Sequence, residues 1–311
     1  MGDHQFENSL SSRRILIIGS AGQLGVELKK CFAGAGSITA VDLPTVDITK
    51  AEQLRAFIRE IKPDIIFNAA AYTAVDRAES EPELAHAVNA QAPRIMAEES
   101  LRSNALFVHY STDYIFDGSK TGAWVESDAP NPLSVYGASK LAGEQAVAGV
   151  GARYLIFRTS WVYGAHGKNF LLTMLRLGQE RDQLSIVDDQ VGAPTTSNEL
   201  AGATHSIVTG ILGGKFGDAA SWAGLYHTTC SGSTSWFGFA EAIFTRASEL
   251  LGARAPELTP ILTSAYPTAA KRPLNSILSN EKLRARFGVE LASWESALDD
   301  VFEALIEGRK N

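Results

Sequence analysis

A buried apolar strand that runs directly into three regularly spaced glycines constrains the fold of this chain most. Residues 13–18 read Arg-Arg-Ile-Leu-Ile-Ile, and Gly19, Gly22 and Gly25 follow in a GxxGxxG pattern. A near-continuous aliphatic run is typical of a strand that is covered on both faces in a parallel sheet. The first glycine permits the tight turn into a helix, the second lets the backbone approach a pyrophosphate, and the third allows close helix packing. The pattern therefore predicts a dinucleotide-binding turn.

Strands and helices continue to alternate after this turn. Apolar runs predict four further strands, at 37–42, 63–68, 106–110 and 154–157. Apolar residues at helical spacing predict helices over 22–33, after a cap at Thr49, over 83–103 and over 139–147. In the helix 83–103 the expected core positions are Leu84, Val88, Ile95 and Leu101. Five strands alternating with helices predict an α/β fold with a doubly wound parallel sheet of the Rossmann type.

The regular alternation of predicted strands and helices ends after Trp161. Glycine, proline and polar residues break the alternation, and helices are expected over 170–181, 198–209, 235–251 and 294–307. We therefore predict a dinucleotide-binding domain at 13–160 and a second, smaller α/β substrate domain at 161–311. Some segments of the second half are expected to return to the first domain and complete its sheet.

Charge and composition exclude several classes of protein. The 311 residues carry a net charge of -7, which gives no electrostatic reason to bind nucleic acid or an anionic membrane. No apolar run approaches the roughly 20 residues of a membrane helix. Residues 1–12 read as a polar, disordered leader without the apolar stretch of a signal peptide. Two cysteines, Cys31 and Cys230, stand in no metal-ligand or redox spacing, which fits a reducing compartment and predicts a cytoplasmic protein.

Acidic and small residues at the next two strand ends suit a dinucleotide. Asp42 can accept hydrogen bonds from the ribose hydroxyls of an adenosine, although a strand-end aspartate can also simply cap a turn. No arginine or lysine follows it directly, so a clamp for a 2′-phosphate is not visible, which favours NADH or use of both cofactors. Asp47 and Ile48 are expected to border the adenine. The small residues at 68–71 would let the cofactor lie against the backbone.

Tyr136 and Lys140, four residues apart, are candidates for proton transfer to a substrate. At this spacing one helix face presents both side chains. A phenol is a poor acid or base at neutral pH, and a nearby ammonium lowers its pKa by stabilising phenolate. Thr112 follows the fourth predicted strand, where ligands of parallel sheets bind, and offers its hydroxyl to a substrate oxygen. In this order the residues predict nicotinamide-dependent reduction, with Tyr136 protonating the alkoxide that forms.

These residues resemble the extended short-chain dehydrogenase/reductase superfamily, whose signature joins GxxGxxG, a Ser/Thr after strand four, and YxxxK. Longer blocks narrow the resemblance to the family of dTDP-4-dehydrorhamnose reductases; they lie at 68–76, 110–118, 132–137, 158–163, 189–195 and 266–276. The resemblance implies that the C4 ketone of dTDP-4-dehydro-L-rhamnose is reduced with NADPH or NADH, in the last step of dTDP-L-rhamnose synthesis.

Residue roles follow from the resemblance by position. The catalytic residues would be Thr112, Tyr136 and Lys140. The cofactor pyrophosphate would be lined by Gly22, Gln23 and Leu24, and the rest of the cofactor would contact Asp42, Asp47, Ile48, Ala71, Tyr72 and Thr73.

On the substrate side, Thr112 and Asp113 would touch the sugar nucleotide and Trp161 would pack on the deoxysugar. Arg272 and Asn275 are candidates for the nucleotide, because an arginine fork can bond two diphosphate oxygens. The plainer alternatives are a core aromatic for Trp161 and a solvated loop charge for Arg272.

The sequence departs from the family at the positions that hold a metal ion between two subunits in some members. Some family members hold Mg²⁺ at a dimer contact through glutamates, and Glu27 matches one of these positions. Asn198 stands where another glutamate is expected, although Glu199 is adjacent. We therefore assign no residue to a metal, treat Glu27 as a helix-surface charge, and leave a monomer and a homodimer open.

Two other functions remain open at this point. The family includes a non-catalytic regulatory subunit that keeps the fold, against which the intact Thr112, Tyr136 and Lys140 argue. A sugar-nucleotide epimerase or 4,6-dehydratase is the other. A dehydratase usually carries acidic residues directly after the strand-four Ser/Thr, whereas here Tyr114 follows Asp113.

Overall fold

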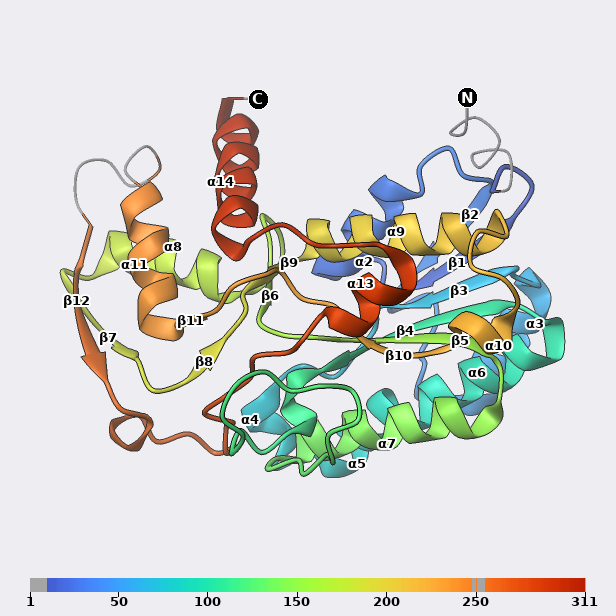
Figure 1. Ribbon diagram of the computed structural model, residues 1–311, viewed down its shortest axis with the longest axis horizontal. Helices are drawn as coiled ribbons and strands as arrows, with labels where there is room; N and C mark the ends of the chain where they lie inside the picture. The colour runs from blue at the N-terminus through green and yellow to red at the C-terminus, as the bar shows by residue number, and fades with distance from the viewer. Residues whose placement is uncertain (1–9, 248–249, 251–254, 311) are drawn as a thin grey trace.

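A six-stranded parallel sheet forms the centre of the molecule. The computed structural model describes residues 10–247, 250 and 255–310. The strand order is β10-β5-β4-β3-β1-β2 (Figure 1). The bounds are β1 Arg14–Ile18, β2 Ser37–Val41, β3 Ile65–Asn68, β4 Leu106–Thr112, β5 Arg153–Thr159 and β10 Gly224–His227. The predicted doubly wound parallel sheet is confirmed, and its sixth strand, β10, comes from the second half of the chain.

Helices cover both faces of this sheet, as Figure 1 shows. The helices on one face are α2 Gln23–Cys31 and α9 Ser197–Leu212, and those on the other are α3 Ala51–Ile61, α6 Ala92–Ser103 and α7 Val135–Val150. Successive residues of a strand point to opposite faces. Accordingly Ile15 and Ile17 join the first core, whereas Leu16 and Ile18 join the second. Burial on both faces explains the uninterrupted apolar run.

The long helix predicted at 83–103 is interrupted. It consists of α5 Pro82–His86, a π-helical turn η1 Ala87–Gln91, and α6. Ile95 is buried as predicted and Val88 is half-buried. Leu84 and Leu101 were wrong as core positions, because they are 42% and 51% exposed. The π turn adds a residue to the helical repeat, so that one apolar spacing cannot describe both sides of it.

Two helix starts also differ from the prediction. Thr49 does not cap α3; its hydroxyl donates to Asp47 Oδ1 at 2.6 Å, and α3 begins two residues later without a side-chain cap. Helix α7 begins at Val135 rather than at residue 139, because Ser134 Oγ accepts a hydrogen bond from the Gly137 amide. Tyr136 and Lys140 therefore lie on one continuous helix.

The predicted leader is wrong for its last part. Leu10 is only 3% exposed and belongs to the first core, and its carbonyl accepts a hydrogen bond from the Arg13 amide. Residues 1–9 lie outside the described residues.

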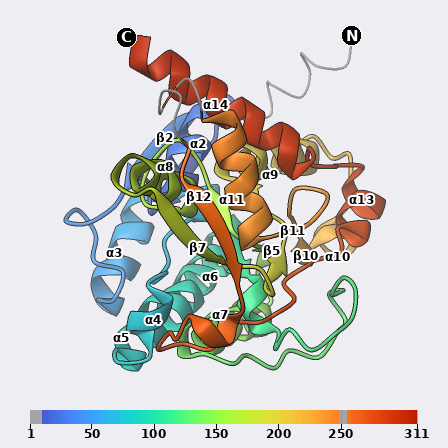
Figure 2. The same ribbon diagram turned by 90° about the vertical axis from the view of Figure 1, so that its left-hand side faces the viewer.

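Short strands and three long helices, α8, α11 and α14, make up most of the rest of the described residues. Figure 2 shows β7 Gln183–Val187 and β12 Glu257–Ile261 side by side, with α8 Phe170–Glu180 and α11 Trp236–Arg246 around them. Two-residue strands pair as β6 Val162–Tyr163 with β9 Thr195–Thr196, and β8 Val191–Gly192 with β11 Thr234–Ser235. The remaining elements are α4 Val75–Ala78, η2 Asp113–Ile115, α10 Ala219–Trp222, η3 Thr263–Ala265, α13 Glu281–Phe287 and α14 Trp294–Lys310.

The helices predicted after residue 160 all exist, but one is shorter. The helix expected at 235–251 ends at Arg246, and residues 248–249 and 251–254 lie outside the described part. Both α9 and β10 belong by sequence to the second half, yet α9 packs on α2 and β10 pairs with β5. Within the described ranges, no helix has both the length and the apolar character to cross a membrane.

Candidate active site

Two adjoining cavities lie along the carboxyl ends of the central strands. The first, of about 400 Å³, is bordered by the ends of β1, β2 and β3, and the second, of about 570 Å³, by the end of β4 and the start of α7. Ala71 lines both, so they form one groove. Ligands of open parallel sheets bind at this edge. We call the first cavity the cofactor end and the second the sugar end.

The glycine turn is a close backbone contact that tolerates no side chain. Gly19 has φ +83°, and a Cβ there would lie 2.4 Å from the Ala70 amide nitrogen. A Cβ on Gly25 would lie 2.1 Å from the Gly19 carbonyl oxygen. Gly22 directly precedes the first turn of α2, and it lines the groove together with Gln23 and Leu24. Such a helix start binds phosphate groups, and the turn fits a dinucleotide pyrophosphate.

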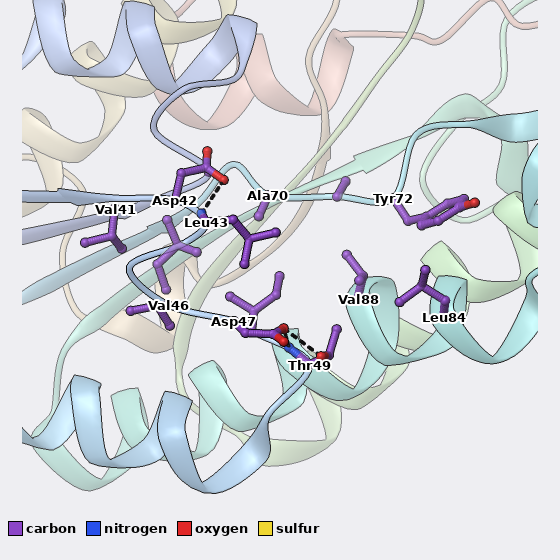
Figure 3. A pocket seen from close by; sticks show the side chains of 14 residues that line it. Val41, Asp42, Leu43, Val46, Asp47, Thr49, Ala70, Tyr72, Leu84 and Val88 are labelled. Atoms are coloured by element: carbon purple, nitrogen blue, oxygen red, sulfur yellow. Dashed lines mark hydrogen bonds between the residues drawn. The ribbon is translucent and has the colours of Figure 1, made fainter.

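Asp42 both shapes the turn and lines the cofactor end. Its carboxylate accepts a hydrogen bond from the Ala21 amide at 3.0 Å. It also accepts one from the Leu43 amide at 2.9 Å, which Figure 3 shows. A carboxylate has about four acceptor sites, so capacity remains for two ribose hydroxyls. The two alternatives foreseen for this residue are therefore compatible.

The remaining walls of the cofactor end are apolar with one fixed charge. Figure 3 shows Leu84 and Val88 opposite Asp47, and Ile48 and Tyr72 line the same cavity. Two hydrogen bonds from Thr49 to Asp47 Oδ1 lower the pKa of Asp47 and keep it ionised. Of the described residues, no lysine or arginine lines this end.

A buried asparagine in the π turn ties the groove to α7. Asn89 Oδ1 accepts from the Tyr72 amide at 2.9 Å, and its Nδ2 donates to the Tyr72 carbonyl and to Ser139 Oγ. A Cβ on Gly143 would lie 2.1 Å from the Asn89 carbonyl oxygen, so α7 and η1 are in direct contact. Sequence reasoning missed Asn89; the available signal was a polar residue directly after the predicted core position Val88 in an amphipathic helix.

Thr112, Tyr136 and Lys140 all line the sugar end, together with Thr73 and Asp113. The Thr112 hydroxyl donates to Asp113 Oδ1 at 2.9 Å and also interacts with the Tyr136 phenol. Burial raises the pKa of Tyr136 to about 12, with Thr112 lowering it and Asp113 raising it further. The structure thus brings the three predicted catalytic side chains to one cavity.

Lys140 does not act on the phenol as expected. Its ammonium donates to the Tyr110 carbonyl at 2.6 Å, and burial lowers the pKa of Lys140 to about 8, partly offset by Glu144. It is not among the groups that shift the pKa of Tyr136, which is raised and not lowered. Desolvation disfavours the charged phenolate and is the largest effect on this pKa. Tyr136 therefore holds its proton at neutral pH, as a proton donor must.

Several polar groups at the sugar end have spare hydrogen-bonding capacity. The buried hydroxyls of Ser111 and Thr159 have no partner within the described residues, and both line the cavity. Burial raises the pKa of Asp113 to about 6, with Ser276 and Thr112 offsetting part of the effect. Unpartnered buried polar atoms in a cavity and a shifted pKa are typical of a site for a polar ligand.

Two tryptophans form one wall of the sugar end. Trp161 and Trp236 stack with ring centroids 3.6 Å apart and an interplanar angle of 8°. Trp161 is half-buried, so it is not a core aromatic. Sequence reasoning missed Trp236, and also Gly167 and Lys168, which line the groove near the Gln23 side chain. No motif marked these residues, because they reach the groove from distant segments.

Arg272 and Asn275 lie outside the residues that line the groove. Arg272 Nη2 donates to Asp76 Oδ2 at 2.7 Å and the guanidinium also interacts with Tyr114. With 22% of its side chain exposed, it is not a solvated loop charge.

The Asn275 prediction lacks support in this geometry. Its Nδ2 donates to the carbonyls of Lys120 and Gly122, and its Oδ1 accepts from the Ile277 amide. The side chain ties loops together and has no free N–H for a nucleotide.

The residues at or beside the metal positions of some family members are engaged elsewhere. Glu27 Oε1 accepts from Lys30 Nζ at 2.9 Å and lies 3.7 Å from His166 Nε2. Glu27 is only 8% exposed, so it is not a simple surface charge. Glu199 Oε2 accepts from the Ala292 amide, and the neighbouring Asn198 is exposed. These donor-rich surroundings do not fit Mg²⁺, and nowhere in the described ranges do three His, Cys, Asp or Glu side chains gather as ligands.

Comparison with known proteins agrees with this geometry. Residues 13–306 match the family described as the RmlD substrate binding domain. A dTDP-4-dehydrorhamnose reductase of Burkholderia thailandensis is 47% identical over 290 residues, which cover 92% of this chain and 96% of that protein. Its counterpart in Escherichia coli K12 is 43% identical, covering 90% and 94%. The crystal structure of the Bacillus anthracis reductase in complex with NADP superposes with a TM-score of 0.85 at 38% identity, covering 94% and 99%.

Proposed function

The chain belongs to the dTDP-4-dehydrorhamnose reductase family, and we propose that it reduces the C4 ketone of dTDP-4-dehydro-L-rhamnose to dTDP-L-rhamnose with NADPH or NADH. This reaction is the last step of dTDP-rhamnose synthesis. The observation that carries the proposal is the convergence of Thr112, Tyr136 and Lys140 on a cavity that joins the glycine turn. A proton donor beside a dinucleotide site is what carbonyl reduction requires.

The cofactor end would hold the adenosine, and the pyrophosphate would lie where the two ends meet, because Gly19 lines the first cavity and Gly22 the second. Gly19, Gly22 and Gly25 admit the pyrophosphate against the α2 amides, with Gln23 and Leu24 beside it. Asp42 would accept the ribose hydroxyls, and the adenine would lie near Asp47 and Ile48. Ala71, Tyr72 and Thr73 would line the path to the sugar end. A bound nicotinamide supplies the hydride that the reduction needs.

The side chains of the sugar end would handle the proton. The Thr112 hydroxyl would hold the C4 oxygen and orient it toward Tyr136. Because burial keeps Tyr136 protonated, its phenol can donate to the alkoxide as charge develops on the C4 oxygen. Lys140 would bind the ribose hydroxyls next to the nicotinamide, from a position fixed by its hydrogen bond to the Tyr110 carbonyl.

The sugar nucleotide would extend away from this centre. Asp113 and Trp161 would border the deoxysugar, and Arg272 would meet the diphosphate if it exchanged its contact with Asp76. We also propose the division into a cofactor domain at 13–160 and a substrate domain at 161–311, with α9 and β10 returning to the first. The free thiols Cys31 and Cys230 support action in the cytoplasm, as a monomer or homodimer.

An absorbance assay tests the proposal. The purified protein is expected to oxidise NADPH or NADH only when dTDP-4-dehydro-L-rhamnose is added, with dTDP-glucose as the control. Binding of NADPH without any substrate-dependent turnover would instead identify a non-catalytic regulatory subunit and overturn the reductase.

A further inference from the structure

The indole ring of Trp161 is covered on one face by Trp236. Their centroids are 3.6 Å apart and the rings are within 8° of parallel, so the overlap is nearly complete. Beyond Trp236 lies Phe170, tilted by 46° with its centroid 4.7 Å away. This face of Trp161 is therefore covered by Trp236 and is not available to pack on a sugar ring.

The backbone of Gly192 covers the other face. A Cβ placed on Gly192 would lie 2.6 Å from Cε2 of Trp161 and 2.9 Å from both Cζ2 and Nε1. A point nearer to this ring-fusion atom than to its bonded neighbours lies above the ring plane and not at its edge. It cannot lie on the side of Trp236, because a parallel ring at 3.6 Å leaves no space there. Trp161 is thus held between an indole and a glycine.

The partner ring is itself anchored. Trp236 Nε1 donates to Gln190 Oε1 at 3.2 Å, and Gln190 Nε2 donates to Thr263 Oγ1 at 3.0 Å. Ser235, the residue before Trp236, caps α11 by accepting from the Gly238 amide. Trp236 is therefore held in place both by its position at the start of α11 and by the hydrogen bond of its side chain.

The backbone of Trp161 adds to the constraint. Its φ of +48° lies in the left-handed region, which bulky residues rarely occupy. Such conformations persist only where the surroundings enforce them, and they cluster at ligand sites. Stacking on Trp236 and contact with Gly192 hold Trp161 in this conformation. Both tryptophans also line the sugar end.

We propose that Trp236 is a positioning residue of the sugar site: with Gly192 it clamps Trp161, so that the indole edges, and not a free indole face, meet the 6-deoxysugar. The inference rests on the proposed function, which assigns the sugar nucleotide to this cavity. An aromatic pair is stabilised by its own stacking beyond simple burial. The clamp therefore fixes the shape of the wall before substrate arrives, which lowers the ordering cost of binding.

Two ligands that differ only by the sugar give the test. We would measure Kd for dTDP-L-rhamnose and for dTDP by calorimetry in wild type, Trp236→Ala and Trp236→Phe. Loss of the clamp should weaken dTDP-L-rhamnose about tenfold and leave dTDP unchanged. KM for the ketone should rise by a similar factor while kcat changes less. Trp236→Phe, which can still stack, should recover most of the affinity.

A second variant disturbs Trp161 from the face opposite Trp236. In Gly192→Ala the new methyl group must displace Trp161, so the sugar-specific loss should recur with Trp236 intact. Trp294→Phe, a change in a buried tryptophan that does not line the groove, is the control for general loss of packing and should keep both Kd values.

The outcomes separate the two proposals. Unchanged dTDP-L-rhamnose affinity in both Trp236→Ala and Gly192→Ala, or equal weakening of both ligands, would overturn the role of Trp236. Wild-type protein that binds neither ligand and turns over no ketone would overturn the proposed function itself, whatever the variants do.

Discussion

The cofactor end and the sugar end of the groove differ in how far apart in the sequence their walls lie. The cofactor end is formed by strand ends, turns and one helical segment, all between Ile18 and Val88. The sugar end joins Thr112 and Tyr136 to Trp161 and Trp236, whose contact spans 75 positions of sequence. The first end is set by local turns, whereas the second depends on long-range side-chain packing. Changes at one end should therefore leave ligand binding at the other end intact.

The largest effect is expected at the junction of the two ends. Tyr136→Phe removes the proton donor and keeps the ring, so kcat should fall roughly a thousandfold. Cofactor Kd and dTDP Kd should both stay within about twofold, because neither end loses a wall. Tyr266→Phe, at a tyrosine that is 57% exposed, is the control. Turnover near the wild-type rate would remove Tyr136 from the mechanism.

The next effect concerns the stability of the sugar end at different pH. The pKa of Asp113, about 6, lies above the ordinary 3.8, so the native state binds this proton more tightly than the unfolded state. The stability contributed by Asp113 is therefore complete below about pH 4 and is lost as the pH rises through 6. Roughly two pKa units correspond to at most about 3 kcal/mol. Asp113→Asn should raise the free energy of unfolding at pH 8 and lose this advantage by pH 4.

Denaturant titrations at both pH values measure this difference. Asp117→Asn is a control of opposite sign, because hydrogen bonds from Ser119 and Asn131 lower the pKa of Asp117. A gain in stability for Asp113→Asn that is the same at pH 4 and pH 8 would show that the carboxyl does not titrate in this range.

A third substitution is designed to break the cofactor end alone. In Gly25→Ala the new methyl group would lie 2.1 Å from the Gly19 carbonyl oxygen, so the backbone must shift. We expect a loss of about 1–3 kcal/mol in stability and at least about tenfold weaker NADPH binding. Binding of dTDP should not change, which calorimetry can check.

Gly149→Ala is the matched control for this glycine. It lies in α7 with nothing within 4 Å of an added Cβ, so alanine should be neutral or stabilise by up to about 1 kcal/mol. Weakened dTDP binding in Gly25→Ala, but not in Gly149→Ala, would mean that the two ends are coupled and would contradict the comparison.

The same difference explains how much the sequence could predict. The strands and the glycine turn were predictable because a short segment carries each signal: an apolar run for β1, and three glycines whose spacing reports a close contact. Thr112, Tyr136 and Lys140 could be placed in one site because parallel strands end at one edge.

What could not be predicted depends on partners that are distant in sequence. The π turn that carries Asn89 closes on Tyr72 and α7, and no local pattern encodes that contact. Trp236 enters the groove through a two-residue strand pair between β8 and β11, too short for a periodic signal. The pKa of Tyr136 depended on burial, which the i, i+4 spacing with Lys140 did not reveal.

The smallest expected effect tests what distinguishes NADPH from NADH at the cofactor end. The Asp42 carboxylate lies where a 2′-phosphate would bring like charge, and no described lysine or arginine lines this end to offset it. Asp42→Asn removes the charge and keeps an acceptor oxygen, so the ratio of kcat/KM for NADPH over NADH should rise about tenfold. Asp47→Asn, in the same cavity but already bonded to Thr49, should change this ratio little. The affinity for dTDP should stay constant in both variants. An unchanged ratio in Asp42→Asn would mean that backbone geometry, and not this charge, sets cofactor preference.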